Sequence, residues 1–504
     1  MSIGQIPFRD FGMPLGFVYW LVPAAFFKIF GPYLLTLVKA QVFINFVTLV
    51  LLRKIFKTLE VAAGIRLILT ILFCISYIMV NFWPWYNNTV FAYQLGALLS
   101  LIVAVHRTQS RWQLFYLGLC AFLGVFSFFT KQDGGALAIV LNAFLLAWSS
   151  WSLRKWWYLP FFLAATFVGF LIFIVPFSQY EFSYWFNYGQ EPHFSRLDIN
   201  DLVFFILQGS FWLKFYLVIV AVIVMTDIRS IGFKQYIGQH GKVLFMLLTL
   251  GIIVQASIIQ VTSYVPINNN IYFHTFCLAF ILSNIKWPFS TARLDFALIG
   301  GLLVMIWWSG SYYKYINRVV SRVLPSKQSE GKEVVSVRTY KSDRTSNEEE
   351  VEVTKSAKGW VSLPGMRSFK GMYMPKTTVD GVKRLQQMKL WEEEKDPKVL
   401  NMTELTPLAY ELGFELEAGS HIPLWFHQNV SFFDRELSFY KERIRSGYYD
   451  VVLFENIPNL NNFYPFELRD YLHQHYQLID TFDAPRKHGG SPKIEVFVPV
   501  SQKR

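Results

Sequence analysis

The sequence predicts a mainly α-helical, multi-pass membrane protein of about ten transmembrane helices that ends in a soluble α/β domain. Of its 504 residues, 53% are hydrophobic and 18% aromatic, and apolar runs follow one another through roughly the first 315. After that point the runs stop and most of the charge appears. The net charge of +12 does not indicate a nucleic-acid partner, because many basic residues lie in short loops between apolar runs, where they set membrane topology.

Ten apolar runs are long enough, or nearly so, to cross a bilayer as helices, which takes about 20 residues. They cover residues 33–53, 61–82, 89–106, 112–130, 135–150, 157–177, 201–226, 243–263, 271–286 and 295–313. The loops between them are alternately basic and nearly uncharged. The basic loops are centred on residues 53–57, 106–111, 154–155, 229–242 and 286–293. By the positive-inside rule these loops are cytoplasmic, so the alternate set faces outward.

The first 31 residues are predicted to lie on the outward side, as an external loop followed by an interfacial helix over residues 16–31. If residues 16–31 crossed the membrane, the run 33–53 would deliver its basic end to the wrong side. As an interfacial helix they would place Tyr19 and Trp20 at headgroup depth. Both termini then lie outside. Because an outward N-terminus without a signal peptide has no obvious export route, we expect this reading frame to lack an upstream transmembrane helix.

Polar and charged residues gather in four of the outward-facing segments. These are the Arg9-Asp10 pair, a hairpin tip at residues 130–135, a loop at 178–200, and a turn at 264–272 with His274 just after it. Each has a purely structural alternative. Lys131 could pair with Asp133 or reach the headgroups, and Asp10 could cap the following helix. His274 could be a satisfied core histidine, and the 178–200 loop could lie on the membrane surface. Their convergence on one face of the membrane favours a functional interpretation.

Short motifs occur along the chain in a recognisable order. Gly4-Gln-Ile-Pro-Phe-Arg-Asp-Phe11 and Pro14-Leu-Gly16 precede an aromatic-rich stretch that ends in Ile29-Phe-Gly31. Thr130-Lys131 lies at a hairpin tip, and a polar turn ending in Tyr272 precedes a late span. In this order the motifs resemble the GT-C glycosyltransferases, in particular the branch of the protein O-mannosyltransferases and the lipid A aminoarabinose transferase. The resemblance covers the apolar part of the chain.

This resemblance implies a membrane glycosyltransferase of the bacterial plasma membrane. Such an enzyme moves a sugar from a polyprenyl-phosphate donor to a glycan, lipid or protein acceptor at the outer face. The resemblance places Lys131 on the donor phosphate, where a cation stabilises the leaving group, and Asp10 near the acceptor as the catalytic carboxylate. The other predicted substrate-binding residues are Arg9, Gln132, Arg196, Tyr272 and His274. No cofactor is predicted with certainty, and the chemistry leaves room for a divalent metal ion.

The chain departs from the family pattern in one respect. Members normally carry an acidic motif between their first transmembrane helix and the Arg-Asp segment, and neither that helix nor that motif is present here. Three alternatives follow from these observations. The chain could be a polysaccharide polymerase or ligase, although those usually place their soluble part between spans. It could be a transporter, although no internal repeat is evident. It could also be an inactive, N-terminally truncated remnant.

The domain limits are predicted from the change in composition: a GT-C-like transmembrane domain at 1–315, a charged linker at 316–360, and a soluble extracytoplasmic domain at 361–504. In the soluble domain we expect helices at residues 378–394, 404–412, 433–446 and 465–475. Short strands are expected at 399–400, 449–454, 476–482 and 494–500. Helices that alternate with short apolar strands predict a small α/β layer domain.

Overall fold

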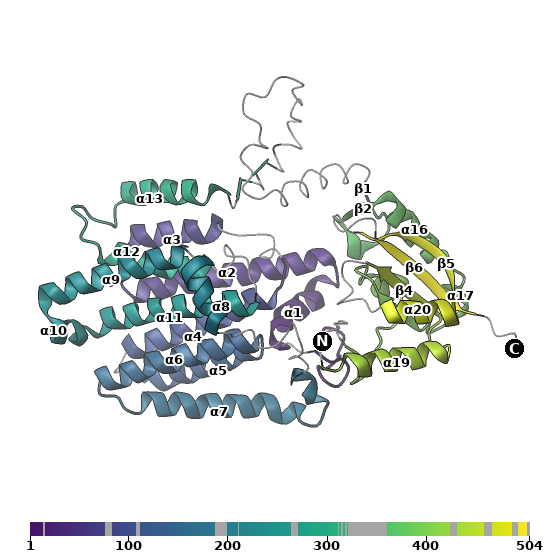
Figure 1. Cartoon of the computed structure of the whole chain (residues 1–504), viewed down its shortest axis with the longest axis horizontal. Helices are drawn as coiled ribbons and strands as arrows, with labels where there is room; N and C mark the ends of the chain where they lie inside the picture. Colours follow the sequence, from purple (N-terminus) through teal and green to yellow (C-terminus); the bar gives the residue numbers. More distant parts are fainter. Residues whose placement is uncertain are drawn as a thin grey trace, which may run out of the picture.

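The computed structural model describes residues 1–13, 16–75, 83–106, 111–186, 199–209, 211–263, 271–310, 312–313, 316–317, 320, 360–423, 431–457, 466–485 and 492–500. Within these residues, a layered set of long helices leads into a smaller C-terminal part that contains the strands (Figure 1). The predicted linker at 316–360 falls almost entirely outside the described residues.

The helices before residue 310 follow the apolar runs of the sequence. They are α1 (Leu21–Phe30), α2 (Leu34–Thr58), α3 (Ala63–Ile75), α4 (Tyr86–His106), α5 (Gln113–Phe128), α6 (Gln132–Ser152), α7 (Tyr158–Phe177), α8 (Ile199–Phe204), α9 (Phe211–Ile231), α10 (Phe233–Gly238), α11 (His240–Ser263), α12 (Ile271–Asn284) and α13 (Leu294–Trp307).

The count of about ten membrane spans is not confirmed. Among the described residues, five helices are long and apolar enough to cross a membrane: α2, α4, α6, α7 and the first part of α11. A pair of helical segments at 199–208 and 212–231, bent by 79°, would make a sixth. The predicted runs at 61–82, 112–130, 271–286 and 295–313 correspond to the shorter helices α3, α5, α12 and α13. These have 13, 16, 14 and 14 residues, fewer than the roughly 20 that a perpendicular crossing needs.

The basic loops that the structure describes lie together at one end of the helical layer, on the left in Figure 1. Short connections make successive helices antiparallel: residues 59–62 join α2 to α3, 153–157 join α6 to α7, and 285–293 join α12 to α13. Helix α10, within the basic 229–242 stretch, lies at the same end. The alternation of charge along the sequence therefore corresponds to an alternation between the two ends of the layer.

The core of the helical layer is apolar, and two of its buried polar side chains bond to each other across two helices. Gln94 of α4 and Gln255 of α11 are 1% and 2% exposed. Each amide nitrogen donates to the other side-chain oxygen, at 2.5 and 2.8 Å. An unpaired amide would be costly in this setting, so the reciprocal pair fixes α4 against α11.

The chain begins with a short turn and helix, as expected, but Tyr19 does not lie where the sequence predicted. A 3₁₀ turn at Val18–Trp20 leads into α1, which packs against α2. Tyr19 is only 4% exposed, and its ring lies 4.3 Å from that of Trp20 and 6.1 Å from that of Tyr86. Protein, rather than lipid headgroups, covers Tyr19 because neighbouring aromatic side chains enclose it.

The C-terminal part is an α/β layer structure, which confirms the predicted class. Strands β1 (Trp360–Ser362) and β2 (Tyr373–Pro375) form an antiparallel pair. A second sheet has the order β3-β4-β6-β5, with β3 (Val399–Met402) parallel to β4 (Val451–Asn456). Its other strands, β5 (Tyr476–Asp483) and β6 (Lys493–Pro499), are antiparallel to each other, and β6 is antiparallel to β4.

Helices cover both faces of this four-stranded sheet. One face packs against α16 (Lys376–Gln386), α17 (Leu390–Glu393) and α18 (Leu408–Leu412). The other face packs against α19 (Phe433–Arg445) and α20 (Phe466–His475). Alternate residues of the strands point to opposite faces, so Val451 and Leu453 belong to one core and Val452 and Phe454 to the other. The predicted helix at 378–394 is observed as two helices, α16 and α17.

Candidate functional site

Three segments that are far apart in the sequence meet at the end of the helical layer opposite the basic loops. They are the N-terminal residues 6–13 and 16–20, the tip between α5 and α6, and the loop at 178–186 after α7. Together they form one cluster of buried side chains, which we call the aromatic cluster: Phe8, Phe11, Met13, Phe17, Val18, Tyr19, Val125, Phe129, Tyr184 and Trp185. Three of the four outward-facing segments singled out in the sequence therefore come together in space.

Two glycines allow this close approach. The backbone N–H of Val18 donates to the carbonyl oxygen of Phe129 at 3.1 Å. A Cβ at Gly16 would lie 1.6 Å from that same oxygen, and a Cβ at Gly12 would lie 2.4 Å from the ring of Tyr184. Only a residue without a side chain fits at either position. The Gly12 and Gly16 positions therefore hold the Arg9-Asp10 segment against the hairpin tip and the loop after α7.

Asp10 is held in a two-point ion pair with Arg9. The Arg9 Nε and Nη2 atoms donate to the Asp10 carboxylate at 2.9 and 2.6 Å, and the backbone N–H of Ile6 donates at 2.7 Å. The side chain of Asp10 is 17% exposed and that of Arg9 46%. The hydrogen bonds from Arg9, supported by the one from Ile6, lower the pKa of Asp10. Asp10 thus binds its own segment and does not cap the following helix.

Lys131 precedes the first turn of α6 and is largely buried. Its Nζ atom lies 2.8 Å from Oδ2 of Asp133 and 5.7 Å from the centre of the Tyr86 ring. Its side chain is 11% exposed, against 30% for Asp133. The pairing with Asp133 is the structural alternative that the sequence allowed. Gln132 donates its amide N–H to the carbonyl oxygen of Trp185 at 2.9 Å, which joins the hairpin tip to the loop after α7.

A polar cavity of about 740 Å³ lies beside the aromatic cluster. It is lined by Phe8, Arg9, residues 178–183, and Ser420 of the C-terminal part. A volume of this size falls within the range of about 300–1,000 Å³ that small-molecule pockets occupy. Arg9 and Glu181 contribute a positive and a negative group to its wall, and Glu181 is 31% exposed. This cavity is the candidate substrate site.

The C-terminal part closes over this region, and the N-terminus lies between it and the helical layer (Figure 1). The Gly12 N–H donates to the carbonyl oxygen of Ile422 at 2.7 Å. The Gly419 N–H donates to the backbone carbonyl oxygen of Asp10 at 2.8 Å. The segment that carries Arg9 and Asp10 is therefore bonded to the C-terminal part on one side and to the aromatic cluster on the other.

A buried acid in α19 completes the contact between the two parts. Glu436 is 1% exposed and accepts a hydrogen bond from the Tyr184 hydroxyl. Burial raises the pKa of Glu436 to about 8. Next to it, Arg435 lies over the ring of Phe432 at 4.0 Å, and its Nη1 is 4.0 Å from Oε1 of Glu181.

Sequence reasoning did not single out Glu436, although a signal was present. Glu436 lies four residues before Tyr440 and eight before Ile444, which places it on the buried stripe of an amphipathic helix. An acid in such a stripe is unusual and indicates a polar partner across an interface.

The remaining predicted site residues are not brought to this cavity by any described contact. His274 is 5% exposed, and its Nδ1 lies 2.9 Å from the Tyr216 hydroxyl. The rings of Phe273 and Trp212 lie 4.1 and 5.4 Å from the imidazole, as expected for a core histidine. Tyr272 lies in the first turn of α12. Arg196, with most of the predicted 178–200 loop, falls outside the described residues.

Within the described ranges, no group of three or more His, Cys, Asp or Glu side chains is arranged to hold a metal ion. The N-terminal motif contains one carboxylate, that of Asp10, and both of its oxygens already accept hydrogen bonds from Arg9. The described residues therefore provide no preformed set of metal ligands.

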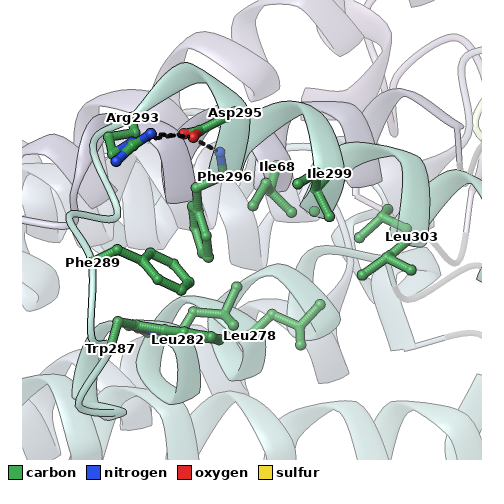
Figure 2. Close-up of a pocket in the computed structure, with 12 residues that line it drawn as sticks. Ile68, Leu278, Leu282, Trp287, Phe289, Arg293, Asp295, Phe296, Ile299 and Leu303 are labelled. Atoms are coloured by element: carbon green, nitrogen blue, oxygen red, sulfur yellow. Dashed lines mark hydrogen bonds and ion pairs between the residues drawn. The ribbon is translucent and has the colours of Figure 1, made fainter.

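A second cavity, of about 600 Å³, lies between α3, α12 and α13. Figure 2 shows its wall of apolar side chains, with the rings of Phe289 and Phe296 side by side and the Arg293–Asp295 ion pair at one rim. These two charged side chains bind each other at 2.6 Å and are 62% and 54% exposed. The cavity is adjacent to the basic loop at 285–293, at the other end of the layer from the aromatic cluster. It offers apolar contact but no cluster of ionisable groups.

Comparison with solved structures finds two crystal structures of ArnT from Cupriavidus metallidurans. The one bound to undecaprenyl phosphate is 13% identical, with a TM-score of 0.47, over 98% of this chain and 88% of that chain. The one in the apo state is 13% identical, with a TM-score of 0.48, over 96% of this chain and 88% of that chain. No family model and no curated protein sequence matches the chain.

Proposed function

We propose that this chain is a membrane glycosyltransferase that transfers a sugar from a polyprenyl-phosphate donor to an acceptor hydroxyl. The observation that carries the proposal is that the three segments carrying Arg9-Asp10, Lys131-Asp133 and Glu181 meet in one aromatic cluster. Charges that only set membrane topology do not need to lie close together. A binding site for the charged headgroup of an apolar lipid does need ionisable groups close together at the end of apolar helices.

Sugar transfer from a phosphate carrier requires few protein groups. The carrier phosphate is a good leaving group, and a cation that neutralises its developing charge stabilises the transition state. In this proposal Lys131 is that cation, and Asp133, at 2.8 Å, orients its ammonium group. Arg9 supplies a second positive charge in the wall of the adjacent cavity. A carboxylate then removes the proton of the attacking hydroxyl.

The orientation in the membrane follows from the loop charges. If the basic loops at one end of the helices lie in the cytoplasm, the aromatic cluster, the polar cavity and the C-terminal part lie outside. Acceptors would then be glycans, lipids or proteins of the cell envelope. The C-terminal part, through Ser420, forms one side of the cavity and is suited to select among them.

The proposal is tested by replacing the phosphate-binding cation. Lys131→Ala should lower sugar release from the donor by about 100- to 1,000-fold, as the loss of one preorganised charge-stabilising donor does. The matched control is Lys242→Ala. Lys242 also pairs with an aspartate, Asp227, at 2.5 Å, but it lies at the basic end of the layer. We expect wild-type turnover from this control.

The measurement uses the full chain in membranes supplied with radiolabelled polyprenyl-phosphate hexoses and pentoses, and it follows the loss of label from the donor. Equal, robust turnover by the wild type and Lys131→Ala would contradict the phosphate site. If no donor is consumed by the wild type, the glycosyltransferase proposal itself fails.

A further inference from the structure

We propose that Glu181 is the base that removes the proton of the acceptor hydroxyl, and that Asp10 is a positioning residue that holds Arg9. This inference rests on the proposed function and deepens it. It concerns the assignment of the two carboxylates that lie near the polar cavity, one in the N-terminal segment and one in the loop after α7.

Asp10 is poorly placed to accept a proton. Its carboxylate already accepts three hydrogen bonds, two from Arg9 and one from the Ile6 backbone. These bonds lower the pKa of Asp10, and a carboxylate of lower pKa is a weaker base. Protonating Asp10 would also break the two-point contact that holds the Arg9 guanidinium at the wall of the cavity. The geometry therefore suits Asp10 to orient a cation.

Glu181 has the opposite arrangement. Its oxygen Oε1 accepts a hydrogen bond from the Ser183 hydroxyl and lies 4.0 Å from Nη1 of Arg435. Among the residues that the structure describes, none forms a hydrogen bond or an ion pair with Oε2. One oxygen is thus held in place while the other is open to a ligand, as a general base requires. At 31% exposure the side chain is accessible from the cavity that it lines.

Glu181 and Arg9 are fixed relative to each other by the backbone. The Glu181 N–H donates to the carbonyl oxygen of Phe8 at 3.3 Å, which places Glu181 beside the Arg9 segment. Both side chains line the cavity of about 740 Å³. A base and a cation on one wall can bind an acceptor hydroxyl and the departing phosphate of the donor at the same time.

The acceptor oxygen attacks the anomeric carbon of the donor, and its proton passes to Oε2 of Glu181. The bond between the anomeric carbon and the phosphate oxygen breaks, and its electron pair stays on the polyprenyl phosphate. Arg9, in the same cavity wall, lies on the side of the resulting charge. Glu181 returns its proton to water, so no oxidant, reductant or further reactant is needed.

The test compares the pH profiles of two variants in the full chain, with labelled polyprenyl-phosphate sugar as donor and total membrane glycolipid as acceptor. A base must be ionised to act, so the wild-type kcat/KM should fall at acidic pH. In Glu181→Gln we expect kcat about 100- to 10,000-fold lower, with the acidic fall abolished. In Asp10→Asn we expect a lower rate that still falls at acidic pH. Glu467→Gln, which changes an exposed carboxylate paired with Lys441, should match the wild type.

The outcomes separate the two proposals. If the wild type turns over and Glu181→Gln keeps the acidic fall, or Asp10→Asn loses it, Asp10 is the base and the inference is overturned. If the wild type consumes no donor, the proposed function fails and the inference fails with it. Should Glu181→Gln not fold, Glu181→Asp decides. A base moved back by one methylene should lower kcat but keep the acidic fall, and an unchanged kcat would count against Glu181.

Discussion

Two Arg–Asp ion pairs at opposite ends of the helical layer have nearly the same local geometry. In both Arg9–Asp10 and Arg293–Asp295, the arginine Nη2 lies 2.6 Å from the aspartate Oδ2. Their surroundings differ. Asp295 is 54% exposed, whereas Asp10 is 17% exposed and its backbone carbonyl accepts a hydrogen bond from Gly419 of the C-terminal part. The pair with the covered carboxylate contributes to a cavity wall shared with Glu181, and the exposed one borders an apolar cavity.

This difference shows that the charges in this protein cannot be interpreted from their local pattern alone. At the basic end, Arg293 pairs with Asp295 two residues away, and Lys242 pairs with Asp227 of the neighbouring helix α9. Charges at the other end are brought together by the aromatic cluster and covered by the C-terminal part. Substitutions at the end that carries the aromatic cluster should therefore affect stability and turnover together. Substitutions at the basic end should affect neither strongly.

The largest effect should come from forcing the N-terminal segment away from the hairpin tip. In Gly16→Ala the new Cβ would lie 1.6 Å from the Phe129 carbonyl oxygen, and backbone cannot rotate away as a side chain can. We expect a loss of about 3 kcal/mol or more in the free energy of unfolding, with loss of turnover. Gly118→Ala, in α5, is the control because its Cβ would meet nothing within 4 Å. Thermal unfolding in detergent compares the two variants with the wild type. Equal unfolding midpoints for Gly16→Ala and Gly118→Ala would contradict this packing.

An intermediate effect is expected from the buried acid between the two parts. Burial raises the pKa of Glu436 from its ordinary value of 4.5 to about 8, so between these values the folded chain keeps a proton that the unfolded chain releases. The stability that this group contributes is therefore present below about pH 4.5 and is lost as pH rises through about 8. The slope should reach about 1.4 kcal/mol per pH unit.

Glu436→Gln should remove this component of the pH dependence, because an amide does not titrate. The measurement is the midpoint of thermal unfolding between pH 5 and pH 9, with Glu467→Gln as the exposed control. A slope that is the same in the wild type and Glu436→Gln would show that Glu436 is ionised in the folded protein at neutral pH.

Patterns that are local in the sequence predicted much of this structure. The expected helix at 433–446 is observed as α19, and the expected strand at 476–482 as β5, because helix and strand periodicities are properties of neighbouring residues. The positive-inside rule grouped the outward segments, and three of them meet in the aromatic cluster. The count of about ten spans is not confirmed, because the described helices α3, α12 and α13 are shorter than the apolar runs of the sequence.

Contacts between distant segments could not be predicted in the same way. Tyr184 and Glu436 are 252 positions apart, and no periodicity links them. Tyr19 was expected at the headgroups because the loop charges made residues 16–31 an interfacial helix, but residues from other segments cover it. The preference for Glu181 over Asp10 likewise depends on which oxygen atoms are already bonded. That information exists only once the loop after α7 and the N-terminal segment are in contact.

The smallest effect should come from the exposed member of the two ion pairs. Arg293→Ala removes a contact between side chains that are 62% and 54% exposed, and exposed pairs of this kind contribute little to stability. We expect unchanged sugar release and an unfolding midpoint close to that of the wild type, with any difference reduced at high salt. Thermal unfolding at low and high ionic strength measures the stability, and the donor-release assay measures the turnover. A fall in turnover as large as that of Lys131→Ala would mean that the basic end also takes part in the reaction, and the contrast between the two ends would be lost.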